Sequence, residues 1–121
     1  MTPTEEAVLA VLAGMAERSR ITGYRGRLTQ HELADAVRCS VREVQEAIQS
    51  LRLAGWPICS SSDGVHPGVW LATDAASVLA NAKRLQRRAV HQLVTSRALR
   101  RTGRRMAVQE AAAQRLTLWS A

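Results

Sequence analysis

Aromatic side chains are scarce in this sequence, whose 121 residues include no phenylalanine, one tyrosine and three tryptophans. Hydrophobic residues still make up 46% of the chain, so a core can form, but it must be built from aliphatic side chains and alanine. Alanine and leucine also favour helices. The composition therefore predicts a mainly helical fold, and the length suits one domain with an appendage.

Signatures of metal sites and catalytic sites are absent as well. Cys39 and Cys59 form no CxxC pair, and the three histidines do not lie at zinc-ligand spacings from them. No nucleophile–base pair, paired carboxylates or phosphate loop can be assembled from the sequence, which argues against an enzyme. We expect two buried or half-buried free thiols, no metal, no cofactor and no catalytic residue.

The sequence also lacks long apolar runs. None approaches the roughly 20 residues that a membrane helix needs, and the N-terminus does not have the basic and then apolar layout of a signal peptide. The sequence therefore predicts a soluble, cytoplasmic protein without a membrane partner.

Acidic residues are nearly missing from the second half of the chain. Residues 1–74 carry seven basic and nine acidic side chains, a net charge of −2, whereas residues 75–121 carry ten basic and one acidic, a net of +9. Nine cations between residues 83 and 105 repel one another, which favours a polyanionic partner, nucleic acid above all. The predicted phosphate-binding cations are Lys83, Arg84, Arg87, Arg88, Arg97, Arg100, Arg101, Arg104 and Arg105.

The region from Thr29 to Gly55 contains two helix starts of the same kind. Thr29 is followed three residues later by Glu32, and Ser40 by Glu43, and each pair is typical of a capping box. Apolar residues recur at helical spacing behind each cap, and Gly55 is a typical stop. The pattern predicts a helix-turn-helix. Its inward positions are Leu33, Ala34 and Val37 in the first helix, and Val44, Ala47, Ile48 and Leu51 in the second.

Further elements are predicted on both sides of this motif. Thr2 and Glu5 form another capping box, opening a helix that we expect to end between residues 17 and 19. Two strand-like runs, residues 56–60 and 69–72, are separated by a segment rich in glycine and serine and predict a β-hairpin.

A helix-turn-helix followed by a hairpin is the winged-helix arrangement. The pattern in residues 27–73 consists of Leu28-Thr29, Glu32-Leu33-Ala34, Ser40, Val44, Ile48, Leu51-Arg52, Gly55, Pro57-Ile58, Gly68 and Trp70-Leu71. With this pattern the segment resembles the winged helix-turn-helix at the N-terminus of biotin-repressor-type regulators, and nothing in the sequence resembles their biotin-ligase domain. The resemblance implies a three-helix core with a wing, a short strand at Arg27 and Leu28 that pairs with the hairpin, and double-stranded DNA as the partner.

The outward positions of the second motif helix are the predicted base-reading residues. Arg42 can bond guanine with two hydrogen bonds, and Gln45 or Gln49 can bond adenine in the same way. The hairpin tip, around residues 61–66, is expected to lie along the DNA backbone or the minor groove, and the arginines of the loop before the motif are also expected to contact DNA. The predicted DNA-binding set in this half of the chain is Arg25, Arg27, Thr29, Ser40, Val41, Arg42, Gln45, Glu46, Gln49, Arg52, Ser61, Ser62 and His66.

After residue 73 the sequence predicts a long basic helix. Thr73 is the expected cap, the helix runs from Ala75 to about Arg101, Gly103 allows a bend, and a last helical stretch covers residues 104–119. We therefore divide the chain into a winged domain, 1–73, and a basic helical extension, 74–121. An apolar stripe longer than the winged domain can cover predicts a homodimer. The stripe consists of Val78, Leu79, Ala82, Leu85, Ala89, Val90 and Leu93.

These features favour a small transcriptional regulator that binds double-stranded DNA in a sequence-specific way. The size, the lack of an effector domain and the arginine content suit a phage or mobile-element repressor. Two alternatives stay open. One is a winged-helix module that docks a polymerase or another regulator, with the C-terminal helix contacting the protein partner. The other is an accessory DNA-binding protein of phage excision or replication.

Overall fold

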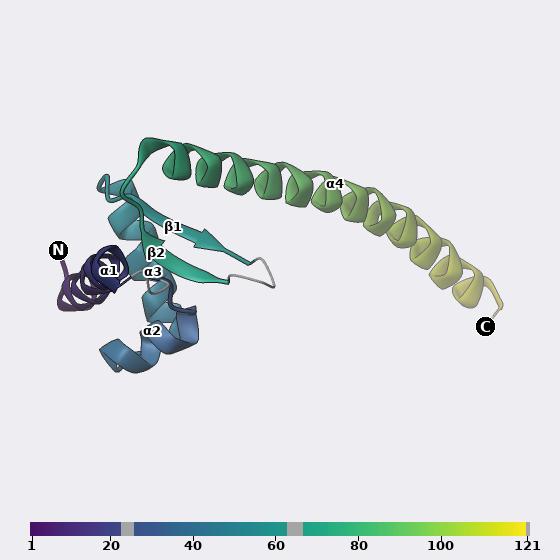
Figure 1. The fold of residues 1–121 in the computed structure, drawn as a ribbon. Helices are drawn as coiled ribbons and strands as arrows, with labels where there is room; N and C mark the ends of the chain where they lie inside the picture. The colour runs from purple at the N-terminus through teal and green to yellow at the C-terminus, as the bar shows by residue number, and fades with distance from the viewer. Residues whose placement is uncertain (23–25, 63–66, 121) are drawn as a thin grey trace. The chain divides into compact units, whose positions relative to one another are not determined.

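The computed structural model describes residues 1–22, 26–62 and 67–120 (Figure 1). The chain divides into two compact units, Met1–Ala82 and Lys83–Ala121. This division lies inside the last helix, so the first turns of that helix belong to the first unit. The boundary between residues 73 and 74 stays a prediction about which part folds alone.

The elements of the described residues follow the order of a winged helix-turn-helix, three helices and then a hairpin, with one more helix behind them. The predicted fold class, mainly α with a small β-hairpin and a long C-terminal helix, is confirmed. The elements are α1 (Pro3–Thr22), α2 (Gln30–Val37), α3 (Val41–Leu53), β1 (Ile58–Ser61), β2 (Gly68–Leu71) and α4 (Ala75–Ser120).

Helix α1 begins with the predicted capping box. The hydroxyl of Thr2 accepts from the Glu5 N–H at 3.1 Å, and the Glu5 carboxylate accepts from the Thr2 N–H at 3.0 Å. The helix runs on to Thr22, about one turn past the predicted end. An ion pair between Glu17 and Arg20, one turn apart on the helix surface, supports this added turn.

The first helix of the helix-turn-helix begins with a complete capping box, and the second begins with only one of the two capping hydrogen bonds. At α2, the Thr29 hydroxyl accepts from the Glu32 N–H and the Glu32 carboxylate accepts from the Thr29 N–H, both at 3.1 Å. At α3, Ser40 Oγ accepts from the Glu43 N–H at 3.1 Å, but the described hydrogen bonds include no return bond to the Glu43 carboxylate. Arg38, in the left-handed region at φ 55°, turns the chain between the two helices.

Among residues 1–22, 26–62 and 67–82, the buried core of the first unit contains aliphatic side chains and no aromatic one, in line with the composition. It is formed where α1, α2 and α3 pack together and where the hairpin closes over them. All the inward positions predicted for α3 are buried, and in α2 Val37 is only half-buried. The buried cluster is Val8, Leu12, Leu33, Ala34, Val44, Ala47, Ile48, Leu51, Ile58 and Val69.

The hairpin is extended by the residues before α2. Strands β1 and β2 pair antiparallel, with Ser61 opposite Gly68. Leu28 forms a bridge to Val69, whose N–H donates to the Leu28 carbonyl at 2.7 Å, so the predicted pairing of this segment is confirmed. Gly68 has φ 135°, and a Cβ there would lie 2.9 Å from the Leu28 carbonyl oxygen. Only glycine lets the two segments approach this closely.

Helix α4 is capped by Asp74 and not by Thr73, so the predicted cap was wrong by one residue. One Asp74 carboxylate oxygen accepts from the Ser77 N–H and the other from the Ser77 hydroxyl, both at 2.8 Å. These donors hold the pKa of the Asp74 carboxyl below its usual value. Aspartate is a strong N-cap because its charge also meets the positive end of the helix dipole.

Gly103, where the sequence allows a bend between two helical stretches, lies inside one continuous helix, α4. Glycine in a helix interior costs about 1 kcal/mol relative to alanine. Arginine and alanine on both sides of Gly103 favour the helix, so this cost is too small to break it. A Cβ at Gly103 would meet nothing within 4 Å in a single chain.

Two side chains join the hairpin of β1 and β2, which we call the wing, to the first turns of α4. Asn81 is 4% exposed, and its amide donates to the Ser60 carbonyl at 2.6 Å. The buried Cys59 thiol donates to the Ser77 carbonyl, with 3.8 Å between sulfur and oxygen. Cys39, in the turn of the motif, is half-buried, and both cysteines are thiols outside any disulfide, as expected.

Candidate nucleic-acid interface

The exposed face of α3 is opposite the core. At about 100° per residue, three polar side chains, Arg42, Glu46 and Gln49, lie on the side of α3 opposite the buried Val44 and Leu51, and Leu53 at the end of the helix lies on that side too. All three of these outward side chains are exposed. The helix-turn-helix therefore presents one cation, one anion and one amide at the centre of its predicted reading surface.

Arg42 and Glu46 pair with each other on this face. The Arg42 Nε donates to a Glu46 carboxylate oxygen at 3.3 Å, and the two side chains are 88% and 68% exposed. An exposed pair of this kind contributes less than about 1 kcal/mol. Arg42 can therefore leave Glu46 for a stronger acceptor, such as a guanine edge, at small cost.

Gln45 lies beside this surface and contacts α2. Its amide nitrogen donates to the side-chain oxygen of Gln30 at 2.8 Å, linking the first turn of α2 to α3. Both amides keep further hydrogen-bonding capacity, because each has two donors and an acceptor. The sequence interpretation missed Gln30, although its position directly after the Thr29 cap was a usable signal.

Two of the predicted contacts on α3 turn toward the protein. Arg52 was expected to be exposed, but it is only about 40° around the helix from buried Ile48, and Val41 only about 20°. Val41 packs half-buried against the core. Arg52 Nε donates to the Ile58 carbonyl at 2.8 Å. The prediction that these two side chains face outward was wrong.

The guanidinium of Arg52 connects the end of α3 to the wing. Besides the carbonyl of Ile58, it bonds Ser60, whose Oγ accepts from Nη2 at 3.0 Å. Burial lowers the pKa of this guanidinium from its usual value. Arg52 therefore fixes where β1 starts relative to the helix, and its hydrogen-bonding groups point away from a ligand on the α3 face.

The remaining predicted contacts of the first unit have mixed positions. Thr29 and Ser40 use their hydroxyls as helix caps, and Ser62 is exposed beside half-buried Ser61 on β1. Arg27 is half-buried, with its guanidinium 3.9 Å from the centre of the Trp70 ring, a cation–π contact. The predicted contacts at residues 25 and 66 lie outside the described residues.

The nine predicted cations of α4 are all exposed. At about 100° per residue, most of them gather on one side of the helix. In the predicted dimer stripe, Val78 is half-buried within the first unit, and Val90 lies on the same side of the helix as most of these cations. The other stripe residues are exposed in the single chain, namely Leu79, Ala82, Leu85, Ala89 and Leu93.

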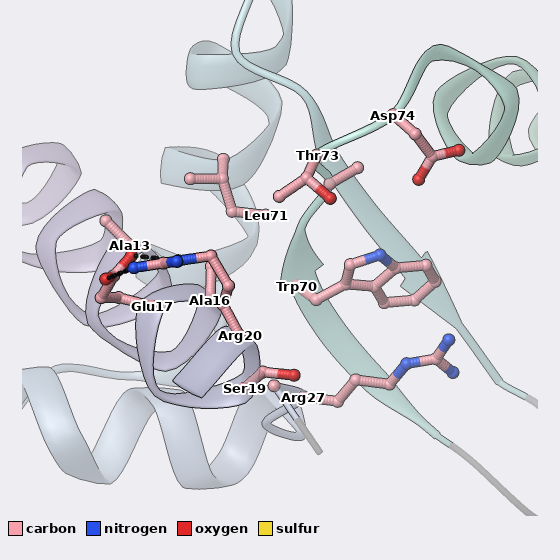
Figure 2. Close-up of a pocket in the computed structure, with 12 residues that line it drawn as sticks. Ala13, Ala16, Glu17, Ser19, Arg20, Arg27, Trp70, Leu71, Thr73 and Asp74 are labelled. Carbon is pink, nitrogen blue, oxygen red and sulfur yellow. Dashed lines mark hydrogen bonds and ion pairs between the residues drawn. The ribbon is translucent and has the colours of Figure 1, made fainter. Parts of the chain in front are cut away.

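A groove of about 470 Å³ lies between the C-terminal half of α1 and β2 (Figure 2). Its charged wall residues already have contacts inside the chain. Arg20 bonds Glu17, Arg27 stacks on Trp70 and Asp74 caps α4. The groove therefore offers no convergent set of polar groups of the kind that defines a ligand site.

Comparisons with family models, with curated proteins and with solved structures found no match to this chain. Across residues 1–22, 26–62 and 67–120, no group of three or more His, Cys, Asp or Glu side chains could hold a metal ion. None of the helices in that part of the chain is long and apolar enough to cross a membrane. Any function must therefore be argued from the geometry of α3, the wing and α4.

Proposed function

We propose that this protein binds double-stranded DNA through its winged helix-turn-helix and acts as a small transcriptional regulator. The observation that carries the proposal is the exposed face of α3, on which Arg42 and Gln49 stand clear of the core while α2 and the wing hold the helix from behind. A helix presented in this way fits the major groove, where arginine and glutamine distinguish bases. The likeness to biotin-repressor-type regulators belongs to this proposal.

The two units divide the work in this proposal. Residues 1–74 have a net charge of −2 and gain little from the phosphate backbone, so they supply base selection. The exposed cations of α4 supply attraction that does not depend on sequence. A basic extension of this kind suits a regulator with a small reading domain, and a phage or mobile-element repressor is the setting that we favour.

The decisive experiment is selection of bound duplexes from a random pool, followed by binding of the selected site to Arg42→Ala. Loss of a two-bond arginine–guanine contact should weaken the preferred site by about 1–3 kcal/mol and leave random DNA nearly unchanged. Arg20→Ala is a matched control, because it also removes one arginine from an exposed ion pair, in the last turns of α1. If the selected duplexes share no common sequence, the proposal of sequence-specific DNA binding is refuted.

One observation favours a second candidate, a winged-helix module that binds a protein. Leu53, the last residue of α3, is 83% exposed, and Trp56 just after it is 40% exposed. Neighbouring exposed apolar side chains are typical of protein contacts. Capture of a polymerase or regulator that is lost with Leu53→Gln and kept with Arg42→Ala would favour this candidate over DNA reading.

A further inference from the structure

Helix α4 carries a face with a seven-residue repeat that becomes continuous only because the helix passes through Gly103. From residue 82 to residue 106, steps of three and four residues alternate between a small and a larger side chain. Such a repeat keeps one face of a helix toward a partner helix. The small positions are Ala82, Ala89, Ser96 and Gly103, and the larger ones are Leu85, Gln92, Leu99 and Met106. We call these eight residues the seam.

The seam is uncovered in the single chain. All eight residues are exposed, and the three large apolar ones, Leu85, Leu99 and Met106, are 39%, 66% and 51% exposed. Isolated helices gain little stability from their backbone alone, and most helices in proteins are stabilised by packing of an apolar face. This face therefore calls for a partner helix.

The charges around the helix indicate what kind of helix that partner is. Only Arg88 and Arg100 stand at positions that flank the seam, and the other seven cations between residues 83 and 105 stand on the outer side of the helix. An acidic partner would call for cations along the flanks. A nearly uncharged seam with its cations turned outward fits a second copy of itself.

We infer that α4 pairs with α4 of a second copy, and that the two helices run antiparallel. Reversing one helix brings every small seam position opposite a larger one. Ala82 then faces the partner's Met106, Leu85 faces the partner's Gly103, and Ala89 faces the partner's Leu99. Cores fill best when large and small side chains alternate across facing positions. A parallel pair would instead stack glycine on glycine and leucine on leucine, leaving voids between crowded layers.

The middle of this register is polar and fits as well. Gln92 faces the partner's Ser96. Because the pair is symmetric, Ser96 also faces the partner's Gln92, so two amide–hydroxyl contacts form side by side. A polar group at a buried seam position specifies register in paired helices. Along the flanks, Arg100 meets the partner's Gln86 and Arg88 meets the partner's Thr102. No like charges face each other, and the outward cations stay accessible.

Antiparallel pairing can be tested by disulfide formation in the full chain. With Cys39→Ser and Cys59→Ala as background, one chain carries Ala82→Cys and another carries Met106→Cys. The mixture should form a cross-linked dimer on mild oxidation, and neither chain alone should. In this register two copies of residue 82 lie about 36 Å apart along the axis at about 1.5 Å per residue. Cross-linking of the Ala82→Cys chain alone, or no cross-linking at all, overturns the inference.

Gly103→Leu separates pairing from helix stability. In one chain the new side chain enters open space and raises helix propensity, so helical circular dichroism should be kept or increased. In the antiparallel pair it would collide with the partner's Leu85, and sedimentation without DNA should show at least a tenfold weaker dimer. Ala98→Leu, on the outer side, is the matched control and should pair like the unchanged chain. Equal or tighter pairing of Gly103→Leu contradicts the inference. The readout contains no nucleic acid, so its failure leaves the proposed DNA binding untouched.

Discussion

The clearest disagreement between sequence pattern and structure, the position of Arg52, makes a sharp prediction. The pattern places Arg52 on the DNA-reading face, whereas the structure has it donating to the Ile58 carbonyl at 2.8 Å and to Ser60 Oγ at 3.0 Å. Replacing it with methionine keeps the apolar stem of the side chain and removes both hydrogen bonds and the charge. If the structure describes the role of Arg52, Arg52→Met should destabilise the first unit.

The size of the effect follows from the two bonds. A hydrogen bond from a charged group contributes about 1.5–3 kcal/mol, and the carbonyl of Ile58, a residue that is 4% exposed, loses its arginine partner. Part of this is recovered because the half-buried guanidinium no longer has to be desolvated. We expect a net loss of about 2–4 kcal/mol, which would lower the Tm of a domain of this size by at least about 8 °C. Ser60→Ala removes one of the two bonds and should cost less.

Tryptophan fluorescence is the appropriate measurement, because the long α4 dominates helical circular dichroism. Trp56 and Trp70 report on the wing, while Trp119 is 89% exposed and should change little on unfolding. A double-mutant cycle of Arg52→Met with Ser60→Ala would show coupling, since the two side chains share a bond. Unchanged stability combined with loss of DNA affinity would refute this reasoning and restore Arg52 to the reading face.

Three further outcomes are expected. The first concerns five exposed arginines of α4, namely Arg97, Arg100, Arg101, Arg104 and Arg105. Changing all five to glutamine should flatten the slope of log K against log salt by about 0.9 for each lost phosphate contact, with unchanged base preference. The Ser77 donors lower the pKa of Asp74, so its helix cap is fully stabilising above the ordinary aspartate pKa. This stabilisation is lost as the pH falls through the lowered pKa. Unfolding of Asp74→Asn should show no such dependence on pH. Glu46→Gln frees Arg42 and removes an anion from the α3 face, so affinity for random duplexes should rise at low salt.

The sequence predicted the parts of the fold that depend on short-range patterns. Capping pairs three residues apart located the starts of α1, α2 and α3 to the residue, because a cap and its partner lie within one turn. The hairpin also followed from local turn residues, although β1 begins at Ile58 and not at Trp56. Its bridge to Leu28 was implied by the resemblance to winged helix-turn-helix domains, and this too is found.

The errors arise where several influences compete at one position. At α4, Thr73 and Asp74 are both good caps, and only the geometry with Ser77 decides between them. At Gly103 the cost of a glycine is smaller than the preference of the surrounding helix formers, so the helix continues where the sequence allows a bend. The prediction that Arg52 faces outward was wrong for a different reason. A side chain at the edge of a helix face points wherever the neighbouring strand offers acceptors, and that strand is not visible in helical periodicity.

Separate placement of charge and reading surface has a consequence for specificity. Under the proposed function, contacts from the outward cations of α4 would strengthen every duplex alike, so they would raise affinity without changing the ratio between the preferred site and random DNA. The ratio must come from α3, where Glu46 engages Arg42 and reduces its attraction for any phosphate. The pair itself is weak, so the selectivity of Arg42 would come from two guanine atoms whose fixed geometry matches its two N–H donors. In the proposed DNA-binding protein, the near-neutral face of α3 thus favours selectivity, and the basic helix provides the affinity that such a face lacks.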